Sequence, residues 1–266
     1  MIRRLLRHRR PSLRSADLHS ADLRLGERLF AAVAAFGVAA VPTALLLVLI
    51  EANWPPLHRL DAAAAERLHT AVRDHPAART ALRVLSEGVW DPLTLRLLVA
   101  VAVGWLLHRR AWRLAVWAAA TVTASGLIGW AVKAAVARAR PALPDPVAHA
   151  PGFSFPSGHA MTAATCCAVL LLVLTPVLGR RALRAARTAA VVSVVGVGFT
   201  RIALGVHWVS DVLGGWLLGL ALVAATAWAF DGWRRDTGRA VPPPLADGLE
   251  PELARHGPPE AGGRTP

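Results

Sequence analysis

Long apolar segments recur along this chain, separated by short polar or basic stretches. Six of them approach or exceed the roughly 20 residues that a helix needs to cross the hydrocarbon layer of a bilayer. They are residues 28–50, 92–108, 112–133, 159–178, 188–206 and 209–230. This pattern predicts an all-α integral membrane protein with six transmembrane helices that pack as a core helical bundle.

Residues 57–87 follow a different pattern, with apolar positions at helical spacing and Pro76 between two candidate helices. We expect an amphipathic helical hairpin on the outer face, which we interpret as a cap on the bundle. In the last segment, Gly215 and Gly219 stand four residues apart, a spacing that favours close helix packing.

Composition agrees with the membrane assignment, since mean hydropathy is +0.43 and 55% of the residues are hydrophobic. Basic residues then indicate the orientation, because basic loops resist translocation. Twenty of the 30 Lys and Arg fall in 1–28, 108–113, 179–187 and 231–266. Both termini are therefore predicted to be cytoplasmic in a multi-pass protein of the cell membrane.

Three regions follow from this organisation. Residues 1–27 form a basic cytoplasmic tail, 28–230 the six-span domain, and 231–266 a Pro/Gly-rich cytoplasmic tail that we expect to be disordered. We attribute the net charge of +13 to contact with anionic lipid head groups and expect no nucleic-acid partner. The adjacent residues Cys166 and Cys167 match no metal or disulfide spacing, and nothing in the sequence specifies an oligomeric state.

The first of three polar clusters, KAAVARARP, lies at the outer end of the third span. Lys133 and Arg140 are seven residues apart, so they share one face if the helix continues, and Pro141 favours a stop. Two snorkelling cations at a helix end are the simpler explanation. Against it, Lys133 is the only lysine beside 29 arginines, on the side where basic residues are least expected.

The second cluster, PSGH, opens the fourth span on the same face. A helix N-terminus offers unpaired N–H groups and a partial positive charge, which favour an anion. Ser157 is a candidate N-cap, and Gly158 allows close approach of a ligand to the backbone. Alone, the motif favours an ordinary serine cap followed by an interfacial His159.

The third cluster, TRIALGVHWVSD, joins the fifth and sixth spans. His207 and Asp211 are four residues apart, so the carboxylate can accept the Nδ1–H and leave Nε2 free as a nucleophile. Arg201 adds a cation, and a structural ion pair between Arg201 and Asp211 is the alternative. Charged residues at membrane depth are nevertheless functional candidates by default, because burying them is costly.

Together the three clusters resemble the signature of the type-2 phosphatidic acid phosphatase family, which also includes vanadium haloperoxidases. The pattern is KxxxxxxRP, PSGH and SRxxxxxHxxxD, and the resemblance covers roughly residues 55–230. Thr200 stands where the family usually has serine, which keeps a hydroxyl group and makes Thr200 a further candidate.

The resemblance implies a phosphate site at the outer end of the bundle, with no metal and no cofactor. His207 would attack phosphorus, Asp211 would orient it, and His159 would protonate the leaving oxygen and then activate water. The phosphoryl oxygens would be held by Lys133, Arg140, Ser157, Gly158 and Arg201.

The predicted function is hydrolysis of a membrane lipid phosphate at the extracytoplasmic face through a phosphohistidine. Polyprenyl pyrophosphate, phosphatidic acid and phosphatidylglycerol phosphate all fit, and an outward-facing site favours the first. A phosphotransferase using the same phosphohistidine stays open as an alternative. A non-catalytic lipid-phosphate binder or transporter is the third hypothesis, although it leaves the His207 and Asp211 spacing unexplained.

Overall fold

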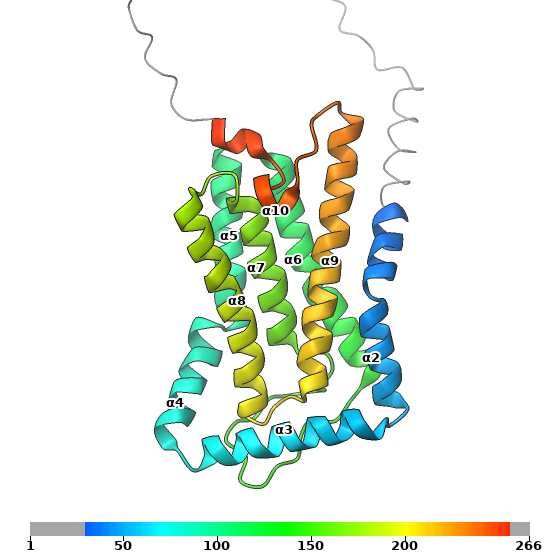
Figure 1. Cartoon of the computed structure of the whole chain (residues 1–266), viewed down its shortest axis with the longest axis vertical. Helices are drawn as coiled ribbons and strands as arrows, with labels where there is room; N and C mark the ends of the chain where they lie inside the picture. Colours follow the sequence, from blue (N-terminus) through cyan, green and yellow to red (C-terminus); the bar gives the residue numbers. More distant parts are fainter. Residues whose placement is uncertain (1–29, 256–266) are drawn as a thin grey trace, which may run out of the picture.

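The computed structural model describes residues 30–255, and it contains only helices and loops within that range (Figure 1). The predicted basic tail of residues 1–27 and the last residues of the other tail, 256–266, lie outside the described residues. The helices, in chain order, are Phe30–Ala39, α2 (Val41–Glu51), α3 (Pro55–Arg73), α4 (Pro76–Val84), a π-helical turn (Leu85–Val89), α5 (Pro92–His108), α6 (Trp112–Val136), α7 (Gly158–Leu174), α8 (Arg180–Ala203), α9 (Val209–Asp236), α10 (Pro244–Asp247) and a 3₁₀ turn (Pro251–Arg255).

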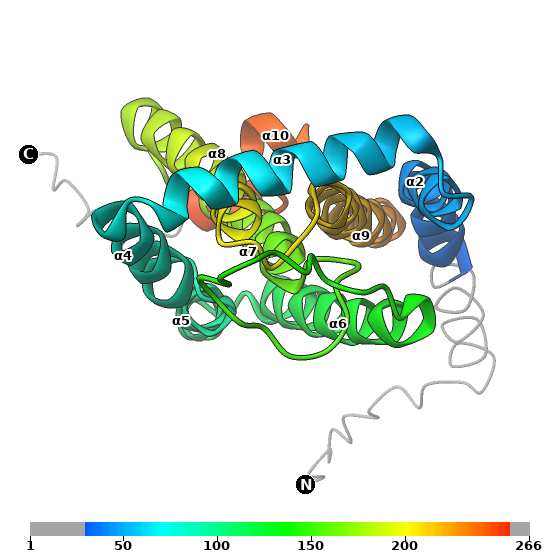
Figure 2. The same ribbon diagram turned by 90° about the horizontal axis from the view of Figure 1, so that it is seen from below.

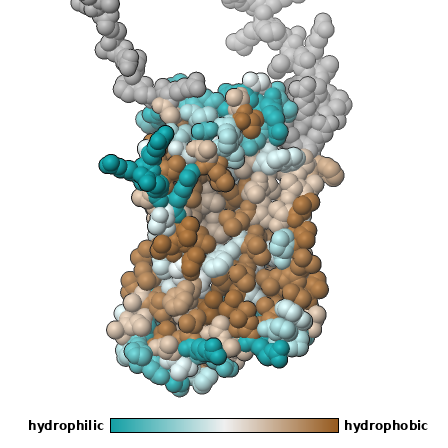
Figure 3. Space-filling model, in the orientation of Figure 1, coloured by the Kyte–Doolittle hydropathy of each residue, from teal (hydrophilic) through white to brown (hydrophobic). Residues whose placement is uncertain are grey.

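The long helices α5 to α9 run side by side, and α7 lies among them as the most buried helix (Figures 1 and 2). Its side chains contribute to the main apolar core together with those of α5, α6 and α9. A broad belt of apolar side chains covers the middle of the molecule, between hydrophilic ends (Figure 3). Exposed residues such as Leu97, Val101 and Val116 belong to this belt, as expected for a surface that faces lipid.

The prediction of six spans holds only in part. Four helices among the described residues are long and apolar enough to cross a membrane, and a fifth candidate is the pair Phe30–Ala39 and Val41–Glu51, bent by 49°. The bend falls beside Pro42 in the first turn of α2, because proline has no backbone N–H to donate to the preceding turn. The predicted span 159–178 ends earlier, since α7 has 17 residues and so a length of about 26 Å.

Close packing of α9 against α7 depends on glycine. A Cβ atom built at Gly215 would lie 2.7 Å from the carbonyl oxygen of Ser157, and one at Gly219 would lie 2.9 Å from that of Met161. Because real Cβ atoms do not approach backbone oxygens so closely, larger residues would push the helices apart. The GxxxG pair therefore fixes α9 against the start of α7, where the second polar cluster lies.

The segment predicted as a hairpin breaks at Pro76, as expected, but its two helices have different roles. Helix α3 lies across one end of the bundle (Figure 2) and buries one face, including Leu57, Ala65 and Val72. Helix α4 instead continues through the π-helical turn into α5. The segment is thus one capping helix followed by an extension of the next bundle helix.

The expectation of a disordered C-terminal tail from residue 231 is wrong for residues 231–255. Helix α9 continues to Asp236, and the chain then folds back so that Leu249 and Leu253 join the main apolar core. The fully buried Arg234 donates to Glu252 at 2.6 Å and to the carbonyl of Ala240. The Pro/Gly-rich composition conceals these few anchoring residues.

Candidate active site

The predicted site residues gather at the end of the bundle that α3 covers. Lys133 lies in the last turn of α6, and the first turn of α7 carries His159. Arg201 lies in the last turn of α8, and Asp211 in the first turn of α9. His207 lies in the connection between α8 and α9. Elements that are distant in sequence therefore bring all three clusters to one end.

His207 and Asp211 form the pair that their spacing predicts. Nδ1 of His207 lies 3.4 Å from Oδ2 of Asp211, and the same oxygen accepts a 2.9 Å hydrogen bond from the backbone N–H of Trp208. Both side chains are buried. Burial lowers the pKa of His207 to about 4, although the hydrogen bond to Asp211 acts in the opposite direction. The imidazole is therefore neutral at pH 7, with Nε2 able to act as an acceptor or nucleophile.

Arg140 lies directly against this imidazole. Its Nη1 is 3.2 Å from Nε2 of His207 and donates to the carbonyl of Val206 at 2.7 Å. Nε and Nη2 donate to the carbonyls of Gly152 and Pro151. Burial lowers the pKa of Arg140, and Asp211 raises it in turn. An anion bound to this guanidinium would thus lie beside Nε2.

Lys133 and Arg140 do not share a helix face, because α6 ends before Arg140. Ala137 adopts a left-handed conformation with φ 49° and stops the helix. Lys133 still points toward the same region, where its Nζ donates to the carbonyl of Phe153 at 2.7 Å. Two of the three ammonium donors remain for another acceptor.

Arg201 is buried and is held by the π-helical turn. Its Nη1 donates to the hydroxyl of Ser86 at 3.0 Å, and its Nε is buried without a hydrogen-bond partner in the described chain. A π-helical turn is a frequent feature of functional sites.

The PSGH motif starts a helix as predicted. Ser157 is the N-cap of α7, and its Oγ accepts from the backbone N–H of Ala160 at 3.5 Å. At Gly158 a Cβ atom would meet nothing within 4 Å, so there is open space beside the backbone. His159 is half-buried and lies in the electrostatic field of Arg201, Arg140 and Lys133. Thr200 is different, because its hydroxyl donates to Val197 of its own helix at 2.8 Å.

Three residues beside the pair are absent from the sequence-based set. Arg138 donates from Nη1 to Asp211 at 2.6 Å and from Nη2 to Asp61 at 2.9 Å. Asp61 accepts from both the backbone N–H and the hydroxyl of Ser210. Arg138 belongs to the first polar cluster, which is the signal that was available. Asp61 gave none, because it is one charge on an amphipathic helix.

The arrangement combines a neutral histidine oriented by a carboxylate with three cations and a helix N-terminus. Within residues 30–255, no group of three or more His, Cys, Asp or Glu side chains is placed to hold a metal ion. The cationic groups and N–H donors can bind a tetrahedral anion, and the His–Asp pair can provide a nucleophile. The molecule is thus a membrane-type helical bundle with a candidate anion site at one end.

Known proteins share part of this sequence and its fold. Residues 114–235 match the model of the PAP2 superfamily. The predicted family resemblance is confirmed, over a shorter range than 55–230. A crystal structure described as the first transmembrane PAP2-type phosphatidylglycerolphosphate phosphatase, from Bacillus subtilis, superposes with a TM-score of 0.64. The two sequences are 25% identical, and the superposition covers 78% of this chain and 97% of the Bacillus protein.

Two curated relatives match shorter segments. Phosphatidylglycerophosphatase B of Bacillus subtilis (strain 168) is 37% identical over 131 residues, 48% of this chain and 63% of the relative. Undecaprenyl-diphosphatase of Sulfolobus acidocaldarius is 39% identical over 71 residues, 25% of this chain and 29% of the relative. The chain therefore matches less than two thirds of the length of either one.

Proposed function

We propose that this protein is an integral-membrane lipid phosphate phosphatase that works through a phosphohistidine on His207. The observation that carries the proposal is the geometry around that residue. Nδ1 of His207 faces Asp211, while Nε2 lies 3.2 Å from Nη1 of Arg140. The guanidinium of Arg140 is a group that binds phosphoryl oxygens well. The relatives named above are lipid phosphatases, which supports the same conclusion.

In the first step, a phosphoryl oxygen would replace Nε2 as the acceptor of the Arg140 N–H. Nε2 of His207 then forms a bond to phosphorus, and the bond from phosphorus to the leaving oxygen breaks. His159 gives its proton to that oxygen. Lys133 and Arg201 would stabilise the charge on the remaining phosphoryl oxygens, together with Ser157 and the N–H of Gly158.

In the second step, His159 takes a proton from water, and the hydroxide attacks phosphorus. The bond between phosphorus and Nε2 breaks, which releases inorganic phosphate and restores neutral His207. All bonds and protons balance without a metal ion. Asp211 keeps the imidazole oriented through both steps.

We place the site at the extracytoplasmic end. The helix Phe30–Ala39 and α10 both lie toward the end of the bundle opposite to α3 (Figure 1), which supports placing both ends of the described chain on one side. Basic residues are in excess in 108–113 and 179–187, where α6 and α8 begin at that same end (Figure 1), which supports its assignment to the cytoplasm. The three substrates of the sequence analysis remain candidates, because each combines a phosphate with a hydrophobic tail.

The test is phosphate release by the purified full-length protein in detergent with EDTA. Polyprenyl diphosphate, phosphatidic acid and phosphatidylglycerol phosphate are assayed with one preparation. We expect turnover of at least one lipid, and loss of several orders of magnitude in His207→Ala. Turnover that requires added divalent metal contradicts the mechanism. Adding alcohol acceptors separates the alternatives, since a phosphotransferase would form a phosphorylated acceptor in place of free phosphate.

A further inference from the structure

Arg96 is a cation within an otherwise apolar helix. It lies about one turn after the start of α5 and extends toward α7, where its Nη2 donates to Oγ1 of Thr162 at 3.5 Å. Among residues 30–255, no carboxylate forms an ion pair with it. An arginine at membrane depth is costly unless it has a function, and nothing in the proposed chemistry uses this one.

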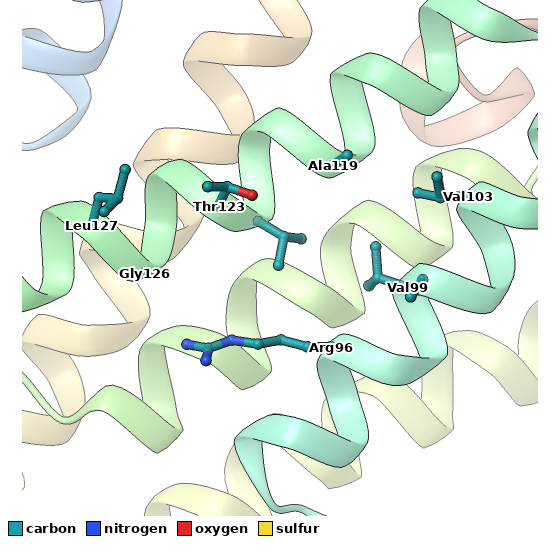
Figure 4. Close-up of a pocket in the computed structure, with 9 residues that line it drawn as sticks. Arg96, Val99, Val103, Ala119, Thr123, Gly126 and Leu127 are labelled. Atoms are coloured by element: carbon teal, nitrogen blue, oxygen red, sulfur yellow. The ribbon is translucent and has the colours of Figure 1, made fainter.

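The guanidinium lies at a groove of about 570 Å³ between α5 and α6 (Figure 4). Apart from Arg96 and Thr123, its walls are apolar and include Val99, Val103, Ala119 and Leu127. Part of this lining is exposed, with Leu127 at 64%, so the groove opens sideways on the apolar belt. A groove of this composition fits a hydrocarbon chain, and the cation in it fits an anion near the head of that chain.

The helix registers direct Arg96 toward the proposed active site. Its partner Thr162 stands three residues after His159, so both lie on the same side of α7. On α6, a Cβ atom at Gly126 would be 3.6 Å from the Arg96 guanidinium. Gly126 and Lys133 are seven residues apart and share one face. On α7 this places the Arg96 guanidinium about one turn, roughly 5 Å, deeper in the bundle than His159, and on α6 about two turns, roughly 10 Å, deeper than Lys133.

From the end of the bundle inward, the order is thus the phosphate-binding cations, Arg96 and the apolar groove. We propose that Arg96 binds a second phosphate of the substrate, between the scissile phosphate and the tail, and that the tail lies in the groove between α5 and α6. The proposal rests on the proposed function. It selects lipids with two phosphates, in which the second is either part of a diphosphate or a phosphodiester beyond a glycerol. Phosphatidic acid has only its scissile phosphate and gains nothing from Arg96.

The experiment compares kcat/KM of full-length wild type and Arg96→Gln for polyprenyl diphosphate, phosphatidylglycerol phosphate and phosphatidic acid. We expect a loss of at least tenfold for one or both two-phosphate lipids and a change below threefold for phosphatidic acid. Loss for the diphosphate alone identifies a directly attached second phosphate, and loss for the glycerol lipid alone identifies the phosphodiester. Arg96→Lys should restore part of the kcat/KM that Arg96→Gln loses for the two-phosphate lipids. Arg184→Gln removes an exposed arginine elsewhere and should leave the ratios unchanged.

Equal losses for all three lipids would overturn the proposal, because a structural role for Arg96 lowers every rate together. Unchanged ratios would overturn it as well. Both results require a wild type that hydrolyses these lipids, so they are distinct from a failure of the proposed function, in which the wild type releases no phosphate or His207→Ala stays active.

The tail has its own test. Ala119→Trp adds a large side chain to the groove, while Val116→Trp adds one at an exposed position of α6 that does not line it. Ala119→Trp should raise KM for long-chain lipids at least fivefold and leave a short-chain analogue unaffected. If both tryptophan variants have the same KM for long-chain lipids, the tail does not lie in this groove.

Discussion

Replacing Arg138 by glutamine should damage both stability and turnover, because one guanidinium joins two buried carboxylates. Arg138 is 2.6 Å from Asp211 and 2.9 Å from Asp61, and the two carboxylates have side-chain exposures of 0% and 2%. Without the cation, two negative charges would face each other in a buried site. Asp211 would then lose a partner that fixes its orientation toward His207.

The size of the effect follows from the partners that remain. Removing one member of a buried ion pair typically costs about 3–5 kcal/mol. Asp61 keeps two hydrogen bonds from Ser210, and Asp211 keeps those of Trp208 and His207. We therefore expect the low end, about 3 kcal/mol of unfolding free energy. A loss of 10- to 100-fold in kcat, equivalent to about 1.4–2.7 kcal/mol, should accompany it.

The assay combines phosphate release with denaturation in mixed micelles. Arg138→Lys keeps the charge but cannot span both carboxylates as a planar fork. It should recover most of the stability and less than a tenth of the lost kcat. Arg59→Gln, an exposed arginine on α3, is the control and should match the wild type.

Two results would refute this reasoning. Wild-type kcat in Arg138→Lys would mean that bridging of Asp61 and Asp211 has no role in orienting His207. Wild-type stability in Arg138→Gln would mean that the buried carboxylates do not need the cation. In a double-mutant cycle, Asp61→Asn and Arg138→Gln should couple by more than about 1 kcal/mol.

The remaining predictions concern packing, pH and a hydroxyl group. Gly215→Ala should lower the melting temperature and the rate, because its Cβ would be 2.7 Å from the Ser157 carbonyl, whereas Gly232→Ala meets open space and should be neutral in both assays. With its pKa lowered from 6.5 to about 4, His207 binds fewer protons in the folded than in the unfolded state. Wild type should therefore lose up to about 3 kcal/mol more stability than His207→Asn as pH falls from 6.5 to 4; parallel melting curves would contradict this. Thr200→Val should keep phosphate release within threefold of wild type, and a larger loss would assign its hydroxyl to the site.

Much of the site was predictable from the sequence because its charges occur at unusual places. Lys133, His207 and Asp211 stand at membrane depth or at helix ends, where chance occurrence is costly. Local spacing also predicted the Nδ1 contact of His207 and the cap of Ser157. These relations involve only neighbouring residues, so the helix period was sufficient.

The parts that escaped prediction depend on tertiary contacts. Asp61 and Ser86 lie on segments whose packing against Ser210 and Arg201 has no local signature. The folded structure of residues 231–255 also depends on tertiary contacts, since Leu249 packs into a core built by distant helices. The end of α6 was also missed, because nothing in the apolar run indicates that Ala137 turns left-handed.

The most direct test of the account is to trap the phosphoenzyme. The full-length protein is mixed with a lipid whose scissile phosphate carries ³²P, quenched within the first turnovers, and mapped by digestion. We predict acid-labile, alkali-stable label on His207 in the wild type and none in His207→Ala. Label on another residue, or full turnover with no labelled protein at any time, would contradict His207 as the nucleophile.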